Sequence, residues 1–147
     1  MGDAVNVFDN LRVPVIASQR ISGETPYYGA NGIQDYVAGF THNGEFVLLA
    51  EDGANDVKNY PCEYVNGKIW VNNHAHVLSG KENKLDNLFF VSRIKAMDIS
   101  PYLVGGGRAK LNANTMLKIE IHLPSLAEQK KIGTLFRRLD RLITLHK

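Results

Sequence analysis

The sequence has a single cysteine, Cys62, and no long apolar run. One thiol cannot form a disulfide within the chain, and the N-terminus has no basic segment followed by an apolar stretch of the kind that directs secretion. The apolar runs are short, such as Phe46–Ala50, and none approaches the roughly 20 residues that a membrane-spanning helix needs. These absences argue against a secreted or membrane protein, and we expect a cytoplasmic chain.

Signatures of catalysis and of metal or nucleotide binding are also missing. Gly105-Gly106-Gly107 is followed by Arg108 instead of the Gly-Lys-Ser/Thr ending of a phosphate-binding loop. No proline is followed by Asp, the pair that usually opens the metal centre of restriction-type nucleases. His74 and His76 form a His-x-His pair, but zinc sites need three or four ligands and Cys62 stands in no CxxC or CxxH arrangement. We therefore expect no catalytic residue, no cofactor and no metal site.

What the chain does have is the composition of one globular domain, with 147 residues of which 44% are hydrophobic. Its net charge of +2 conceals an asymmetry. Residues 1–80 hold 4 Lys/Arg against 9 Asp/Glu, whereas residues 81–147 hold 13 against 6. The basic second half is compatible with a surface that meets nucleic acid phosphates, although solvated helix faces produce similar splits.

Short β-rich runs bounded by turn residues fill the chain as far as Pro124. Four of them predict strands: Glu45–Ala50, Lys68–Val71, Leu88–Ser92 and Leu117–Leu123. The last run alternates apolar and polar residues, which is typical of a half-buried strand. Asn-Gly and Asp-Gly pairs predict tight turns beginning at Asn31, Asn43, Asp52 and Asn66. Residues 1–124 are therefore expected to form a small mixed sheet.

A long helix is predicted after Pro124. Ser125 is a candidate N-cap, and Glu128 stands three residues later, at the spacing of a capping box. Apolar residues follow in a 3-4-3 spacing, at Ile132, Leu135, Leu139 and Leu142. Phe136 and Ile143 widen this stripe, which we expect to be buried in a helix pair. No Gly or Asn stop signal occurs before the chain ends, so we expect the sequence to end inside the helix. The fold class is thus α+β: a mixed-sheet domain over residues 1–124, then one amphipathic helix over residues 125–147.

Four segments of the chain carry a resemblance to a known family: residues 26–37, 45–54, 68–78 and 110–132. The last is the most specific. In it, a strand closed by Pro124, a capped helix start and Glu128-Gln129-Lys130-Lys131-Ile132 occur together in one order. On these segments the chain resembles the specificity subunits of type I restriction-modification systems over nearly its whole length.

The resemblance implies a function. A full subunit of that family holds two target-recognition domains, each followed by a long helix, and the two helices pack antiparallel as a spacer. Each domain reads one half of a split sequence in double-stranded DNA, while separate methyltransferase and restriction subunits modify and cleave. The resemblance therefore implies a non-catalytic chain whose helix pairs with a second copy or with a second recognition domain. The alternative is a protein-interaction module that pairs through its helix without touching DNA.

Two loop regions offer the side chains that DNA contact requires, namely amides and guanidinium groups for base edges and cations for phosphates. The predicted DNA-contacting residues are Arg20, Tyr27, Tyr28, Asn31, Asn73, Arg108, Lys110 and Asn112. For Tyr27 and Tyr28, a role as core aromatics explains the residue equally well. For Asn31, the alternative is that it holds the turn before Gly32. The His74 and His76 pair is best interpreted as a satisfied polar cluster that supports loops.

Overall fold

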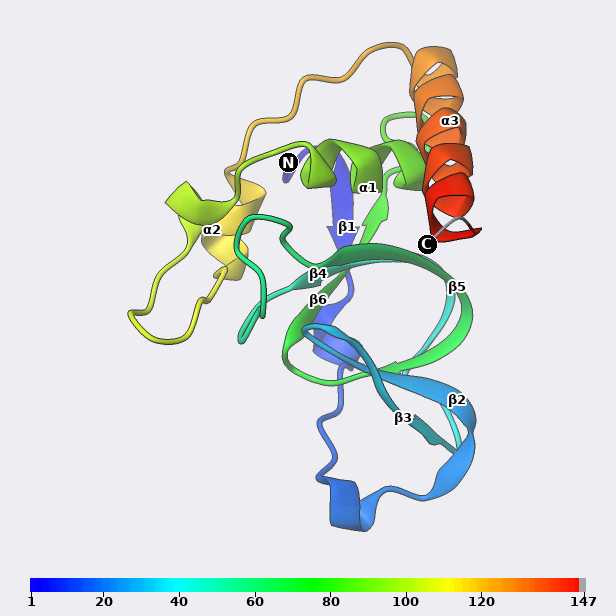
Figure 1. The fold of residues 1–147 in the computed structure, drawn as a ribbon, viewed down its shortest axis with the longest axis vertical. Helices are drawn as coiled ribbons and strands as arrows, with labels where there is room; N and C mark the ends of the chain where they lie inside the picture. The colour runs from blue at the N-terminus through cyan, green and yellow to red at the C-terminus, as the bar shows by residue number, and fades with distance from the viewer. Residues whose placement is uncertain (146–147) are drawn as a thin grey trace.

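The computed structural model describes residues 1–145, and its centre is a mixed six-stranded sheet (Figure 1). The strands are β1 (Val5–Val7), β2 (Ser22–Gly29), β3 (Gly32–Val37), β4 (His42–Ala50), β5 (Cys62–Val71) and β6 (Ala75–Gly80). They lie in the order β1-β6-β4-β5-β2-β3. All neighbours are antiparallel except β2 and β5, which are parallel. The predicted α+β class with a mixed sheet and one long C-terminal helix is confirmed.

The α-helices are α1 (Asn87–Lys95), α2 (Ala113–Leu117) and α3 (Leu126–Leu145), and short 3-10 turns occur at η1 (Asp9–Leu11), η2 (Ala17–Gln19) and η3 (Ser100–Tyr102). Helix α1 packs on β4, β5 and β6, and α3 lies alongside α1 (Figure 1). As predicted, α3 begins with Ser125, whose hydroxyl accepts a hydrogen bond from the Glu128 amide at 3.2 Å. His146 and Lys147, which the prediction included in the helix, lie outside the described residues.

The core lies on both faces of the sheet. Val47 and Leu49 point into one cluster, together with Phe90 and other residues of the helical side. Phe46 and Leu48 point into a second cluster on the opposite face. Successive side chains of a strand alternate between faces, so residues Phe46–Ala50 of β4 form an unbroken apolar run because both faces are covered there.

The predicted strand Leu88–Ser92 is wrong, because these residues form the middle of α1. The Asp86 carboxylate caps this helix by accepting a hydrogen bond from the Phe89 amide at 3.0 Å. Phe90 and Ile94 are buried four residues apart on the face toward the sheet. A run of five residues is too short to distinguish a buried helix from a buried strand by its periodicity.

The predicted strand Leu117–Leu123 is also wrong, because Leu117 ends α2 and residues 118–125 pair with no strand. The segment still has a buried side, since Ile119 is 1% exposed. Its backbone is tied to the chain start, where the Gly2 amide donates to the Leu117 carbonyl at 2.9 Å. Alternation here reflects an extended segment that packs on the core without joining the sheet.

Two of the four predicted turns lie inside strands. Asn43-Gly44 belongs to β4 and Asn66-Gly67 to β5, and the two glycines face each other in the antiparallel ladder. Gly67 has a φ of +112°, a conformation that favours glycine, and here it bends a continuing strand. The turn predicted at Asn31 is confirmed, because Asn31 lies in the β2–β3 turn. Asp52 lies in the loop after β4, where it forms an isolated β-bridge with Lys110 instead of a tight turn.

Candidate nucleic-acid interface

Loops from distant parts of the chain meet around residues 51–55, which follow β4. The side-chain nitrogen of Asn31, in the β2–β3 turn, donates to the Gly53 carbonyl at 3.0 Å. Its side-chain oxygen accepts from the Asn55 amide at 2.9 Å. The predicted turn-holding role of Asn31 is therefore real, although the side chain is exposed and keeps one N–H and one lone pair.

The loop around the three glycines reaches the same place. Val104 and Lys110 close it with two backbone hydrogen bonds of 2.9 Å each, and the Gly53 amide donates to the Ala109 carbonyl at 3.0 Å. Arg108 donates through Nε to the Asp52 carboxylate at 2.6 Å, while its side chain remains 61% exposed. An ion pair this exposed contributes little stability, so the guanidinium can exchange Asp52 for a phosphate at low cost.

The β5–β6 turn is the third loop attached to this segment. The His74 carbonyl accepts hydrogen bonds from the Glu51 and Asp52 amides at 2.9 and 3.3 Å. Asn73, beside it, is exposed, as are Lys110 and Asn112 after the glycines. Three loops that carry predicted DNA contacts are thus joined through residues 51–55.

Arg20, Tyr27 and Tyr28 lie elsewhere and have structural partners. Tyr27 is 1% exposed, and its hydroxyl accepts from the Val15 amide and donates to the Val15 carbonyl at 2.9 and 3.1 Å. Arg20 lies over the Tyr27 ring at 4.1 Å and pairs with Asp35. Tyr28 is buried in the core, and burial raises the pKa of its hydroxyl to about 12. In this structure neither ring is accessible to a DNA base, so both tyrosines are better described as core aromatics than as DNA contacts.

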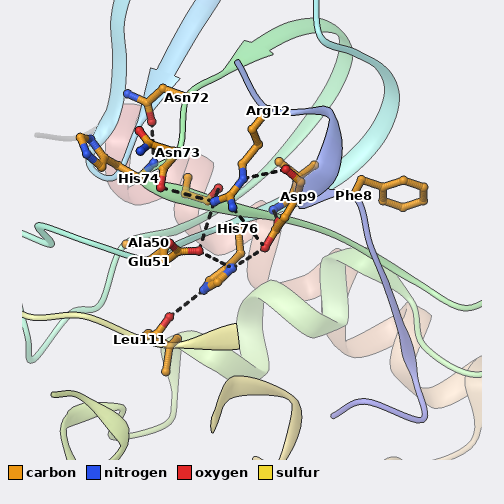
Figure 2. A network of polar contacts seen from close by, with 12 residues as sticks. Phe8, Asp9, Arg12, Ala50, Glu51, Asn72, Asn73, His74, His76 and Leu111 are labelled. Atoms are coloured by element: carbon orange, nitrogen blue, oxygen red, sulfur yellow. Dashed lines mark hydrogen bonds and ion pairs between the residues drawn. The ribbon is translucent and has the colours of Figure 1, made fainter. Parts of the chain in front are cut away.

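A network of charged side chains lies beside the β5–β6 turn, with His76 buried and the other members partly buried (Figure 2). We call it the charged hub, and it consists of Asp9, Arg12, Glu51 and His76. His76 is 0% exposed, and its Nδ1 lies 2.7 Å from the Asp9 carboxylate and 3.2 Å from the Glu51 carboxylate. Its Nε2 bonds to the Leu111 carbonyl at 2.8 Å.

Arg12 completes the charged hub and extends it to the β5–β6 turn. Its guanidinium donates to the Glu51 carboxylate at 3.1 Å and to the Ala75 and Asn73 carbonyls at 3.1 and 3.4 Å. Burial acts to raise the pKa of the Asp9 carboxyl, but hydrogen bonds from His76 and the Val77 amide, with the charges of His76 and Arg12, lower it overall. The hub is thus an ionic network that links η1 to three other chain segments.

Asp9, Glu51 and His76 could offer three ligand atoms that lie within 4.8 Å of one another. The Arg12 guanidinium lies in the same cluster and already neutralises Glu51. Among the described residues, every buried polar side-chain atom has a hydrogen-bond partner. This donor set therefore fits an ion-pair network better than a metal centre, and His76 supports loops as the sequence suggested.

Sequence reasoning missed Asp9, Arg12 and the hub role of Glu51. Asp9 and His76 are 67 residues apart, and no periodicity or motif joins positions at that separation. A lone Asp and a lone Arg in an irregular N-terminal segment carried no local signal that would have distinguished them from solvated surface charges.

The apolar stripe of α3 is exposed within this chain. Leu135, Leu139 and Leu142 are 55%, 43% and 54% exposed, and only Ile132 of the predicted set packs against the core. The helix meets α1 through a different side, where Gly133 lies so close that a Cβ would stand 2.6 Å from the Phe89 amide nitrogen. The sequence predicted that this stripe is buried, but most of it is exposed in the isolated domain.

Gln129 attaches the start of α3 to the domain and was not recognised from the sequence. It is 1% exposed and accepts a hydrogen bond from the Asp86 amide at 2.9 Å. Its side-chain nitrogen donates to the Lys84 and Pro124 carbonyls at 3.0 and 3.1 Å. One amide side chain therefore fixes α3 against the segment that begins α1.

The mixed sheet and the long C-terminal helix form a fold that solved structures share. The fold matches the type I restriction-modification S subunit of M. genitalium with a TM-score of 0.77 and 13% identity, over 95% of this chain and 37% of that one. It also matches a chain solved in work on complex assembly and conformational transition of the type I system, with a TM-score of 0.66 and 12% identity, over 99% and 38%.

The chain belongs to the type I restriction modification DNA specificity domain family, whose model matches residues 2–147. It is 46% identical over 142 residues to a protein of Haemophilus influenzae that is named as a type I restriction enzyme specificity subunit, covering 97% of this chain and 37% of that protein. It is 26% identical over 118 residues to the EcoprrI specificity subunit of Escherichia coli, covering 80% and 28%. The chain thus spans about a third of the length of these relatives, 37% of the first and 28% of the second. Within residues 1–145, no helix is long and apolar enough to cross a membrane.

Proposed function

We propose that this chain is a target-recognition domain that reads one half of a split sequence in double-stranded DNA and directs separate methyltransferase and restriction subunits. Family membership supports this role. The structural observation that carries it is the joining of three loops with exposed Asn31, Asn73 and Arg108 around residues 51–55. A pure protein-interaction module is not favoured, because it would not require this gathering of amides and cations.

The contacting set that we propose is smaller than the sequence suggested. It consists of Asn31, Asn73, Arg108, Lys110 and Asn112, all of which are exposed. Amide side chains suit adenine edges, and a guanidinium suits either guanine or phosphate. Arg20, Tyr27 and Tyr28 are left out because their side chains hold the β2–β3 end of the sheet together.

The test is DNA binding by Arg108→Ala and Lys110→Ala at several salt concentrations, in the complex with the methylating subunit. A lost phosphate contact weakens binding to all sequences alike and reduces the salt slope by about one unit. A lost guanine contact costs about 1–3 kcal/mol and only at sites that contain that base. Lys84→Ala is the matched control, because Lys84 precedes α1 and bonds to the Asp3 carbonyl. Unchanged affinity in both loop variants and in Asn73→Ala would contradict the proposed surface.

The proposal includes a non-catalytic role for this chain. In the charged hub, the two carboxylates are paired with Arg12 and His76, which is the arrangement of a structural ion-pair network. Purified chain incubated with S-adenosylmethionine and DNA is expected to transfer no methyl group. Robust transfer without added subunits would overturn this part of the proposal.

The exposed stripe on α3 supports helix pairing as a second part of the proposal. Leu135, Phe136, Leu139 and Ile143 leave apolar surface in water over two helical turns, and patches of this kind mark interaction sites. We propose that the stripe packs on the corresponding helix of a second copy or of a second recognition domain. This pairing would place two DNA-reading surfaces at a fixed separation.

A further inference from the structure

We propose that His76 is a positioning residue for DNA contact, which acts by fixing the base of the glycine loop that carries Arg108 and Lys110. The inference rests on the proposed function, because it concerns the same DNA-contacting loops. It assigns a role to a fully buried side chain that does not itself reach DNA.

The glycine loop has little of its own to hold it. Around Gly106 and Gly107, no atom lies within 4 Å of the position that a Cβ would take. Glycine also loses more conformational freedom on ordering than any other residue. The position of the loop must therefore be set at its base, where Val104 and Lys110 pair and Leu111 enters the domain.

Leu111 is held from both sides by the charged hub. Its amide donates to the Glu51 carbonyl at 2.7 Å, and its carbonyl accepts from His76 Nε2 at 2.8 Å. The imidazole ring makes a polar contact through each of its nitrogens, and Nε2 is the one that faces Leu111. This leaves Nδ1 facing the Asp9 carboxylate at 2.7 Å. The orientation of the imidazole ring, and with it the place of Leu111, is thus set by Asp9.

The same hub fixes the loop that carries Asn73. Arg12 bonds to Glu51 and also to the carbonyls of Asn73 and Ala75. Arg12 and His76 both face the carboxylates of Asp9 and Glu51. The charged hub is therefore tied to Leu111, at the base of the glycine loop, and to the turn that carries Asn73 (Figure 2).

The experiment compares His76→Gln with His42→Gln. His42 is a matched control, because it is also a buried histidine, 2% exposed, but it bonds to Phe8 and Thr41 and not to the loops. Both variants should be less stable than the wild type. At a temperature where both remain folded, only His76→Gln should weaken DNA binding in the complex, with a salt slope reduced by about two units, one for each displaced cation.

A double-mutant cycle then separates positioning from general destabilisation. If His76 acts through the loop, adding His76→Gln to Arg108→Ala/Lys110→Ala should change affinity by less than about twofold, the usual limit of experimental additivity. A full additional loss would overturn the inference. Wild-type affinity in His76→Gln would also overturn it, while leaving the proposed function intact if the double alanine variant still binds weakly.

If the double alanine variant binds as tightly as the wild type, the proposed contact surface fails, and hydrogen exchange then tests the inference. The amides of Val104 and Lys110 should exchange faster in His76→Gln than in His42→Gln, because their pairing depends on the position of Leu111. Equal exchange rates would overturn it. Should His76→Gln fail to fold, Asp9→Asn, which keeps the size of the side chain, is subjected to the same measurements with the same expected results.

Discussion

Replacing Gln129 by Leu tests whether one buried amide fixes α3 to the domain. The two side chains are similar in size, so the change removes three hydrogen bonds without opening a large cavity. It leaves the Asp86 amide and the Lys84 and Pro124 carbonyls without their partner. The substitution therefore isolates the polar attachment of the helix.

The magnitude follows from the three groups left without partners. A buried polar group that loses its partner costs about 1–3 kcal/mol, and the low end applies because α3 begins near the surface, where water can reach the freed groups. Three groups then cost about 3 kcal/mol, and burial of the more apolar side chain offsets about 1 kcal/mol. We expect a net loss of about 2 kcal/mol in the free energy of unfolding, or a melting temperature lower by about 4–8 °C.

The assay is urea unfolding followed by circular dichroism, with Lys130→Leu as the control. Lys130 is the next residue of the helix and is exposed, and Lys and Leu have similar helix propensities. The control should therefore change stability by less than about 0.5 kcal/mol. If Gln129→Leu unfolds at the same urea concentration as Lys130→Leu, the reasoning that Gln129 holds α3 to the domain is refuted.

Three further predictions concern the helix stripe, the thiol and a buried histidine. Leu135→Asp combined with Leu139→Asp should dissociate a wild-type dimer observed by light scattering, because charge would enter the apolar stripe; an unchanged mass would contradict pairing through it. Burial raises the pKa of the Cys62 thiol to about 12, so a thiol reagent at pH 8 should label the unfolded chain but not the native one, and rapid native labelling would count against this. Burial lowers the pKa of His42, and the Arg12 charge acts in the same direction. The hydrogen bond to the Phe8 carbonyl and the Asp9 charge act to raise this pKa, but the net shift is downward. The unfolded chain then binds a proton that the folded chain does not, so the stability contributed by neutral His42 is lost as pH falls below about 6.5; His42→Gln should show a weaker loss of stability between pH 7.5 and 5.5, and equal losses would refute this.

The hub also suggests why the loops can carry few internal contacts. Glu51 contributes both its carboxylate to His76 and its carbonyl to Leu111. A loop whose base is fixed in this way can vary in its side chains without losing its position. The physical requirement is that the fixed part be held by a connected polar network, which the buried His76 and its three partly buried partners form together.

Local signals in the sequence determined the features that depend on near neighbours. The capped start of α3 followed from Ser125 and Glu128, three residues apart, and the β2–β3 turn followed from Asn31-Gly32. The family-specific order of segments around Pro124 and Gln129 also predicted the fold class and the DNA-recognition role. These features were readable because a cap or a turn is completed by residues within four positions of each other.

The tertiary structure alone decided which polar residues lie buried together and which predicted contacts are available. Asp9, Glu51 and His76 meet because β6 lies between β1 and β4 in the sheet, and no local pattern contains that strand order. The same order buries Tyr27 and makes Leu88–Ser92 a helix, because the surface that α1 covers exists only after distant strands have paired. Local hydrogen bonds and spacing thus specified the elements, whereas pairing between residues dozens of positions apart specified the charged hub and the loops joined around residues 51–55.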